Sequence, residues 1–382
     1  MMEDTGVYLD HAASAPLRPE AREALLPFLD GRFGNPSSIH RFGREARAAL
    51  EDARARLARV IGAAPAELVF TRAGTEADNL AVLGRARERP GAPVAVSAIE
   101  HRAVLASAHA AEEAGSPLVL LPVDGGGVVR LDALDAALEA GPAVVSVMWA
   151  NNEVGALQPV GEIGARCRAA GVAFHSDAVQ ALGKAPVRVD QVPVDLLAFS
   201  AHKVGGPKGV GALYVRRGTR LHPLLFGGGQ ERGMRPGTED VAGAAAFAAA
   251  AEGAEAERET AMARIGALRD RLEAGLRDAV PGLIVNAAGA PRLPTISNLS
   301  VPGADPELLL MGLDLEGIAA SSGSACSSGA VEPSHVLTAM GIPRELAGPS
   351  LRFSLGWTTT EADVARVLGV FPRVAARVRG AG

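Results

Sequence analysis

The sequence predicts an α/β protein whose mainly parallel central sheet is flanked by helices. Between residues 67 and 215, short apolar runs typical of buried strands alternate with longer segments of helical periodicity. That alternation favours parallel strands joined by crossover helices. With 382 residues, the chain also exceeds what one hydrophobic core usually carries. We therefore expect a large domain at residues 15–255 and a smaller α+β domain formed by residues 1–14 and 256–382.

The composition is that of a globular enzyme. Apolar residues make up 48% of the chain and charged residues 21%, and the net charge is −5, so no electrostatic attraction to nucleic acid or an anionic membrane is expected. The first residues lack a basic stretch followed by an apolar core, and the alanine-rich residues 242–251 are too few to span a bilayer. The eight histidines lack paired ligand spacing, which argues against a metal site. We expect a cytoplasmic protein.

The first part of the chain predicts a short apolar segment and two helices. Residues 7–16 begin with an apolar run that ends at Asp10 and continue with small side chains. Residues 18–29 and 44–61 are rich in Ala, Arg, Glu and Leu with helical periodicity. An arm that only packs against the rest of the protein is one interpretation of the first segment.

A candidate anion site follows in residues 67–84, which predict a short strand and then a helix. Backbone N–H groups at the start of that helix, with the hydroxyl of Thr75, can bind an anion. Gly74 lets the backbone approach such an anion closely. A threonine before a helix also serves simply as an N-cap, so both interpretations stay open.

The next two predicted strands also end in side chains that can act on a ligand. Residues 92–105 run from a strand into a helix with His101 at the junction, where an imidazole can stack on an aromatic ligand and transfer protons, or cap the helix. Residues 143–159 contain the longest apolar run and predict a central strand that ends in Asn151 and Asn152. Their amides can bond a phenolic oxygen or a carboxylate, or form a turn.

An acid and an amine end the next two apolar runs. Residues 171–180 carry Asp177 and then Gln180, and residues 196–209 lead into Lys203, one of only three lysines. A lysine for the aldehyde carbon and an acid for the pyridinium nitrogen are what pyridoxal phosphate requires of a protein. Burial at a strand end would favour the deprotonated amine that such chemistry needs, whereas a solvated loop lysine is the alternative.

In proteins built on a parallel sheet, ligands bind beyond the carboxyl ends of the strands. Five candidate residues occupy such ends: Thr75, His101, Asn152, Asp177 and Lys203. Their coincidence favours a single site over five unrelated structural roles.

The two cysteines differ in their predicted settings. Cys167 lies inside the amphipathic helix expected at residues 162–171 and fits a small buried hydrophobic residue. Residues 307–330 predict a helix, a strand and then a loop of small residues around Cys326. That composition suits an accessible nucleophile, and an incidental thiol in a linker is the alternative.

Three further segments complete the chain. Residues 222–241 are rich in glycine and arginine and fit a surface loop, and the helical residues 242–279 connect to the second domain. Residues 349–370 hold Arg352 in a strand before a helix. Its guanidinium can bind a carboxylate through two hydrogen bonds, although an ordinary surface arginine also fits the pattern.

In this order, the motifs resemble the cysteine desulfurases among the fold-type I pyridoxal-phosphate enzymes. The matching strings are EHRAVL at 100–105, GGGQER at 227–232, RPGTED at 235–240 and SSGSAC at 321–326. The last string is similar to that of the group with the bacterial housekeeping and nitrogenase-associated enzymes. The chain departs from the family pattern at Ser14-Ala15, where two threonines are usual, and at Ala73-Gly74, where glycine and alanine are exchanged.

The resemblance implies a role for each candidate residue. Lys203 would bind pyridoxal 5'-phosphate covalently, Asp177 would face its ring nitrogen, and His101 would stack on its ring and transfer protons. Arg352 would bind the substrate carboxylate, and Cys326 would attack the substrate sulfur. The remaining contacts would come from Gly74, Thr75, Asn152, Gln180, Ser200 and His202, and from Thr238 of the partner subunit in a homodimer.

The function that the resemblance implies is conversion of L-cysteine to L-alanine, with the sulfur held as a persulfide on Cys326. An iron–sulfur scaffold protein or a tRNA-thiolation enzyme would accept the sulfur. A selenocysteine lyase, or another lyase or aminotransferase of the same fold, is the alternative. A non-catalytic adaptor is disfavoured because Lys203, Asp177 and Cys326 are all present.

Overall fold

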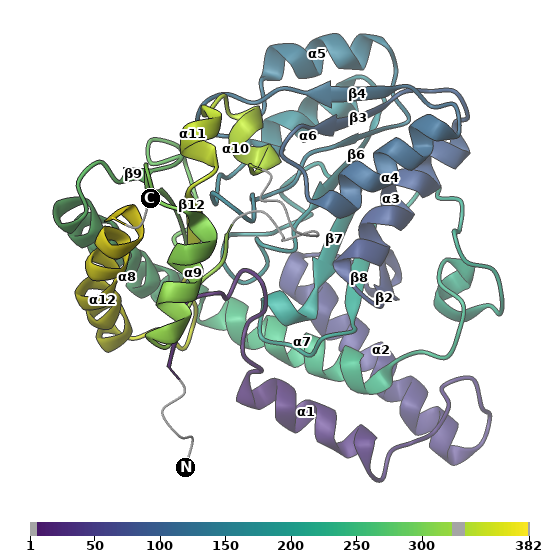
Figure 1. Ribbon diagram of the computed structural model, residues 1–382. Helices are drawn as coiled ribbons and strands as arrows, with labels where there is room; N and C mark the ends of the chain where they lie inside the picture. The colour runs from purple at the N-terminus through teal and green to yellow at the C-terminus, as the bar shows by residue number, and fades with distance from the viewer. Residues whose placement is uncertain (1–5, 323–332, 381–382) are drawn as a thin grey trace.

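A seven-stranded sheet forms the centre of the larger part of the molecule (Figure 1). The computed structural model describes residues 6–322 and 333–380. The strands, in spatial order, are β2 (Leu68–Thr71), β8 (Gly211–Val215), β7 (Leu196–Ser200), β6 (Ala173–Asp177), β5 (Val144–Ser146), β3 (Val94–Ser97) and β4 (Leu118–Leu121). Both pairs that include β8 are antiparallel, and the other four pairs are parallel. The predicted α/β class with a mainly parallel sheet is confirmed.

Helices cover both faces of this sheet, since successive strand residues point to opposite sides. Leu196 and Ala198 of β7 pack with side chains of one helix, whereas Leu197 and Phe199 pack into the large cluster on the other face. The first face carries α3 (Gly74–Glu88) and α4 (Arg102–Glu113), and the large cluster includes α1 (Pro19–Leu29), α2 (Arg41–Ile61), α5 (Leu131–Glu139), α6 (Val160–Ala169) and α7 (Val241–Ala256). Burial on both faces explains why the strands are continuous apolar runs in the sequence.

A second cluster of buried apolar side chains lies to the left in Figure 1. It is built on a three-stranded sheet in the order β12, β10, β9. Its elements are α8 (Arg258–Ala279), β9 (Ile284–Val285), β10 (Ile296–Ser300), α9 (Pro306–Leu315), β12 (Ser350–Ser354) and α12 (Glu361–Gly380). Val7 and Leu9 join this cluster, and β1 (Val7–Tyr8) pairs with β11 (Ile318–Ala319). The start of the chain thus packs with its last third. The boundaries of the two domains at residues 14/15 and 255/256 stay a prediction.

Two short helices belong with the first cluster although they come late in the chain. These are α10 (His335–Ala339) and α11 (Arg344–Ala347). Leu337 and Ala347 are buried in the large cluster. The segment after residue 332 therefore crosses back to the large sheet before β12 begins.

Two elements differ from the sequence-based expectation. Within residues 143–159, only β5 is a regular strand, and the chain then continues beside β6 through hydrogen bonds from Val147 N–H to His175 O (3.1 Å) and from Trp149 N–H to Asp177 O (2.8 Å). The helical region expected at 242–279 is two helices, α7 and α8, which are separated at Glu257.

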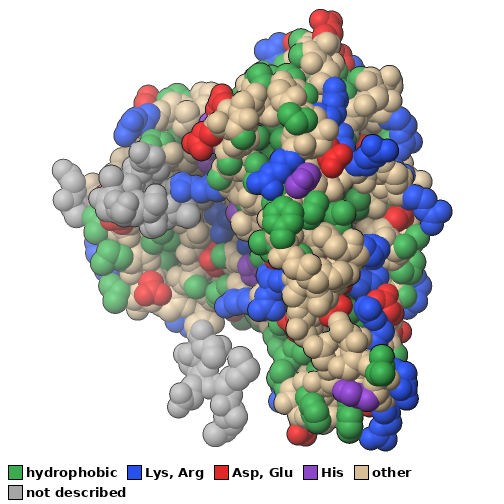
Figure 2. All heavy atoms as spheres, turned by 90° about the vertical axis from the view of Figure 1, so that its right-hand side faces the viewer, with side chains coloured by type: hydrophobic (Ala, Val, Ile, Leu, Met, Phe, Trp, Pro, Cys, Tyr) green, Lys and Arg blue, Asp and Glu red, His purple; other side chains and the backbone are tan. Residues whose placement is uncertain are grey.

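The outer surface is mixed in character. On the face shown in Figure 2, basic and acidic side chains are interspersed with apolar and neutral ones. Several large apolar side chains are exposed, among them Phe33, Ile39, Leu225 and Phe226. Within the described part of the chain, no helix has both the length and the apolar character needed to cross a bilayer.

Candidate active site

The site is organised by two neighbouring parallel strands, β6 and β7. Asp177 is the last residue of β6 and lies opposite Ala198 of β7, so both strands end at the same edge of the sheet. β7 ends at Ser200, and the short 3₁₀ turn η2 (Ala201–Lys203) carries Lys203 beyond it. The acid and the amine therefore lie at one edge of the sheet, as the two apolar runs predicted.

A cavity of about 420 Å³ opens at this edge. Most of the predicted site residues line it: Gly74, Thr75, His101, Asn152, Asp177, Gln180, Ser200, His202, Lys203 and Arg352. Thr238 is exposed and is not one of the residues that line this cavity. Cys326 lies outside the described residues. Residues that are far apart in the chain, such as Gly74 and Arg352, thus share one cavity.

Lys203 has the properties of a reactive amine. Its Nζ donates hydrogen bonds to the carbonyl oxygens of Ala12 (2.7 Å) and Ala13 (2.8 Å). Burial first, and the positive charge of Arg352 next, lower the pKa of Lys203 to about 8, although Asp177 and Asp10 oppose the shift. The deprotonated fraction of this amine near neutral pH is therefore larger than that of an ordinary lysine, as attack on a carbonyl requires.

Asp177 provides the opposite charge within the same cavity. One of its carboxylate oxygens accepts a hydrogen bond from Val179 N–H (2.8 Å). Burial raises the pKa of Asp177, while His101, that hydrogen bond and Lys203 lower it. The carboxyl group of Asp177 is thus shielded from water, and its charged form is stabilised by the groups that contact it.

The start of α3 provides anion-binding groups. The helix begins at Gly74, and the N–H groups of its first turn have no partners within the helix. The N-cap is Ala73 and makes no side-chain cap bond, so Thr75 is not the N-cap and its hydroxyl borders the cavity. A Cβ atom at Gly74 would lie 2.7 Å from Cγ2 of Val179, which explains the glycine.

Two polar side chains complete this end of the cavity. Ser200 is the residue before η2, and His202 lies within it. His202 Nδ1 lies 3.3 Å from Ser14 Oγ. Burial and the nearby charges of Lys203 and Lys208 lower the pKa of His202 to about 4, so its imidazole is neutral at physiological pH.

His101 caps a helix and also lies in the wall of the cavity, while its role in ring stacking and proton transfer stays a prediction. It is the N-cap of α4, where its Nδ1 accepts a hydrogen bond from Ala103 N–H (3.1 Å). It also lines the cavity. Because Nδ1 is occupied by the helix, Nε2 is the nitrogen left for a ligand.

Arg352 is buried and held in place by two partners, so it is not an ordinary surface arginine. Its Nη2 forms an ion pair with Asp10 Oδ1 at 2.8 Å, and its Nη1 donates to the carbonyl oxygen of Asn152 (2.9 Å). Its side chain is 7% exposed. The guanidinium is thereby fixed at the border of the cavity, where it can meet a carboxylate.

Gln180 lies between the two ends of the site. Its Nε2 donates to Ala12 O (2.8 Å), and its Oε1 accepts from Lys184 Nζ (3.0 Å). Ala12 O thus receives hydrogen bonds from both Gln180 and Lys203. The amino-terminal arm does more than pack, because it supplies the carbonyl groups that hold the lysine.

Sequence reasoning missed several residues of the cavity wall. Ala12 and Ala13 contribute through their backbone, which leaves no signal in side-chain type. Asp78 also lines the cavity. The signal for Asp78 was present, because a carboxylate four residues after Gly74 lies on the same face of a helix as the helix start.

The cavity thus combines a half-buried lysine, a buried acid and the start of a helix. The family model "Aminotransferase class-V" matches residues 7–367, and the chain belongs to this family. It is 46% identical to a "Cysteine desulfurase IscS" of Dictyoglomus turgidum over 98% of this chain and 95% of that relative. Within the family, the chain belongs with the cysteine desulfurases.

Solved structures agree with this placement. A "NifS-like protein" has a TM-score of 0.90 and 35% identity, with 97% of this chain and 100% of that chain covered. A structure described as "SspA in complex with cysteine" has a TM-score of 0.80 and 32% identity, with 91% of this chain and 98% of that chain covered.

Proposed function

We propose that this protein is a pyridoxal-phosphate-dependent cysteine desulfurase that converts L-cysteine to L-alanine. The observation that carries the proposal is the shared cavity in which Lys203, Asp177 and the anchored Arg352 all take part. The desulfurase relatives support the reaction, and the cysteine complex of one structural neighbour supports the substrate.

The residues of the cavity fit pyridoxal phosphate. Lys203 would hold its aldehyde carbon, and Asp177 would bond its ring nitrogen. The first turn of α3 with Thr75, together with Ser200 and His202, would hold its phosphate, because unpartnered N–H groups and hydroxyls are good phosphate donors. When bound, the cofactor supplies an electron sink that weakens bonds at the substrate's α and β carbons.

Three side chains would handle the substrate and its protons. Arg352 would bind the carboxylate of L-cysteine, with its orientation preset by Asp10. Lys203 would take the proton from the α carbon, which its lowered pKa permits. His101 would transfer a proton through Nε2, since Nδ1 is engaged by α4.

Sulfur transfer would use Cys326. Its thiolate would attack the substrate sulfur, a sulfur–sulfur bond would form, and the carbon–sulfur bond would break. The electron pair would stay with the former β carbon, which takes up a proton and leaves as part of L-alanine. The persulfide would then pass its outer sulfur to a protein acceptor, either an iron–sulfur scaffold or a tRNA-thiolation enzyme. This step is supported by the SSGSAC string.

A homodimer in the cytoplasm would complete the enzyme. Thr238 of the partner subunit would reach the cofactor phosphate. The glycine-rich segment that contains this threonine exposes Leu225 and Phe226, which favours contact with another surface. No role in direct binding of nucleic acid or membranes is proposed.

The first test measures L-alanine and sulfide from L-cysteine, with a reductant present, at equal cofactor occupancy. Cys326→Ala should lose nearly all activity. Cys167→Ala is the matched control, because Cys167 is buried within α6 and burial raises the pKa of its thiol to about 12. Equal activity of Cys326→Ala and the wild type would exclude the persulfide step. Faster turnover of L-selenocysteine by both would favour a selenocysteine lyase.

A further inference from the structure

Two buried carboxyl groups, those of Asp78 and Glu100, lie near Asp177. Asp78 of α3 is 1% exposed, and its Oδ1 has no hydrogen-bond partner. A carboxyl oxygen of Asp78, a carboxyl oxygen of Asp177 and a ring nitrogen of His101 all lie within 4.8 Å of one another. Glu100, which precedes His101, is fully buried, and its Oε2 is likewise unpartnered. Nothing in the proposed reaction uses Asp78 or Glu100.

These carboxyls differ in the positive charge that is available to them. Within the described residues, neither Asp78 nor Glu100 forms an ion pair with a lysine or arginine. His101 lies near both Asp78 and Asp177, whereas Asp177 also has Lys203 nearby and accepts a hydrogen bond from Val179 N–H. Any negative charge in the group is therefore most stable on Asp177.

His175, the histidine that faces the unpartnered oxygen of Asp78, is neutral. His175 Nε2 lies 3.6 Å from Asp78 Oδ1, and His175 Nδ1 lies 2.8 Å from Ser146 Oγ. Burial lowers the pKa of His175 to about 3, so the imidazole carries no charge that could stabilise an ionised Asp78. Burial raises the pKa of Asp78 well above its usual value, and any negative charge on the neighbouring carboxyls of Asp177 and Glu100 raises it further. Two carboxylates this close in a dry site do not both ionise.

We propose that Asp78 is a positioning residue that stays protonated and shares its proton with Asp177 in a hydrogen bond. This bond supports the ionised form of Asp177. This hydrogen bond between Asp78 and Asp177 does not depend on a bound cofactor. Its consequence, that Asp177 presents a carboxylate to the cofactor ring nitrogen, rests on the proposed function.

The placement of Asp78 ties this role to the anion-binding end of the cavity. Asp78 lies four residues after Gly74, so both are on one face of α3. Gly74 and Thr75 in the first turn of the helix line the cavity, and the next turn places Asp78 beside Asp177. One rigid element thus holds both the proposed phosphate contacts and the acid behind the proposed ring-nitrogen contact.

Two substitutions separate proton sharing from simple packing. Asp78→Asn keeps the shape and retains an N–H donor for Asp177. Asp78→Leu has nearly the same size but no donor, so it leaves Asp177 with less support for its charge. If Leu prevents folding, Asp78→Ala removes the donor without adding bulk.

The first measurement is infrared difference spectroscopy of the full chain without cofactor. At neutral pH the wild type should show the carbonyl band of a protonated, buried carboxyl, and Asp78→Asn should lose part of that band. Glu100→Gln is the matched control and should remove a separate component, because burial also raises the pKa of Glu100. An unchanged band in Asp78→Asn would mean that Asp78 is ionised, which would overturn the proposal.

The second measurement is titration of the cofactor-free chain with pyridoxal phosphate, followed by absorbance across pH. Asp78→Leu should bind the cofactor about tenfold more weakly, because Asp177 loses the hydrogen-bond donor that supports its charge. Asp78→Asn should restore most of the affinity and the wild-type pH dependence of the spectrum. Tighter binding by both variants would reveal repulsion from a charged Asp78 and would overturn the proposal. A protonated Asp78 in a wild type that binds no pyridoxal phosphate would refute the proposed function alone.

Discussion

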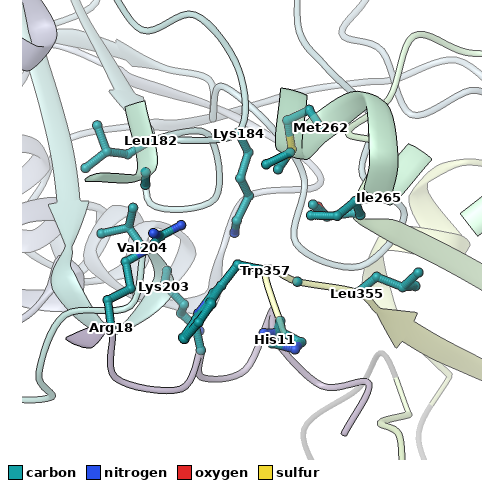
Figure 3. Close-up of a pocket in the computed structure, with 16 residues that line it drawn as sticks. His11, Arg18, Leu182, Lys184, Lys203, Val204, Met262, Ile265, Leu355 and Trp357 are labelled. Atoms are coloured by element: carbon teal, nitrogen blue, oxygen red, sulfur yellow. The ribbon is translucent and has the colours of Figure 1, made fainter. Parts of the chain in front are cut away.

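Lys203 lines two pockets that differ in the side chains around them. On one side is the large cavity of about 420 Å³ with Asp177, Arg352 and the start of α3. On the other side is a pocket of about 40 Å³ that Lys203 also lines, together with Lys184 and mainly apolar side chains (Figure 3). Both pockets contain a lysine with a lowered pKa, about 8 for Lys203 and about 7 for Lys184.

The small pocket lacks what makes the large cavity a candidate for chemistry. Lys184 donates to Gln180 Oε1, and within the described residues it has no carboxylate partner. The apolar side chains of Met262, Ile265 and Leu355 line one side of the pocket (Figure 3). A buried amine alone is therefore not a site. Opposed charges, an anion-binding helix start and room for a ligand distinguish the large cavity.

The largest effect should separate the two lysines. Lys203→Ala should abolish covalent attachment of the cofactor and reduce turnover by roughly 10²–10⁴-fold or more, because the amine that holds the cofactor and moves the proton is gone. Lys184→Ala should still attach the cofactor. Absorbance and mass spectrometry after borohydride reduction would measure both, with the exposed Lys208→Ala as the control. Covalent cofactor in Lys203→Ala would refute the assignment of the amine.

A smaller effect should distinguish the arginines that border the two pockets. Arg352→Ala should raise the KM for L-cysteine about 10- to 100-fold, since losing hydrogen bonds to a charged group costs about 1.5–3 kcal/mol. Arg352→Lys should recover little of this, because an ammonium group cannot bind a carboxylate through a planar fork.

Arg18 provides the matched comparison in the small pocket. It pairs with Glu20 and Glu257 and lies over the Trp357 ring at 5.3 Å. Arg18→Met should lower Tm and leave KM unchanged, because its contacts are structural. A wild-type KM in Arg352→Ala would show that the substrate carboxylate binds elsewhere.

The last effect concerns the charge of Lys184 and appears only in the pH dependence of stability. Its pKa falls from 10.5 to about 7 on folding because of burial first and the charges of Lys203 and Arg352 next. The unfolded state therefore binds more protons between about pH 7 and 10.5, so the free energy of unfolding rises with pH in that window. The cost of burying the charged amine is fully present below pH 7.

Lys184→Met should remove this cost. In the cofactor-free protein, the Tm of the variant should exceed that of the wild type most below pH 7, and the difference should vanish toward pH 10.5. Thermal unfolding followed by circular dichroism at several pH values measures it. A Tm difference independent of pH would mean that Lys184 keeps its usual pKa in the folded protein.

Much of the site was predictable because it depends on local patterns. Asp177 and Lys203 end two apolar runs, and such runs become buried parallel strands whose carboxyl ends meet at one edge of a sheet. The α/β class followed from the same alternation of runs. Gly74 and Thr75 follow a strand and open a helix, which predicted an anion site without knowledge of the fold.

Tertiary structure alone decided which partners these residues meet. The pairing of Arg352 with Asp10 joins residues 342 positions apart, and the carbonyl groups that hold Lys203 lie 190 or more positions away. Periodicity records only which side of an element is buried, so it contains no information on such pairs.

Asp78 shows the same difference between what the sequence determines and what the tertiary structure decides. The sequence by itself determined that Asp78 shares a helix face with Gly74, and that lysine and acid end neighbouring strands. Only the packing of α3 against the sheet decided that Asp78 lies beside Asp177, away from water and from every described lysine or arginine partner. Proton sharing depends on distance and local dielectric, and these arise only when the chain is folded.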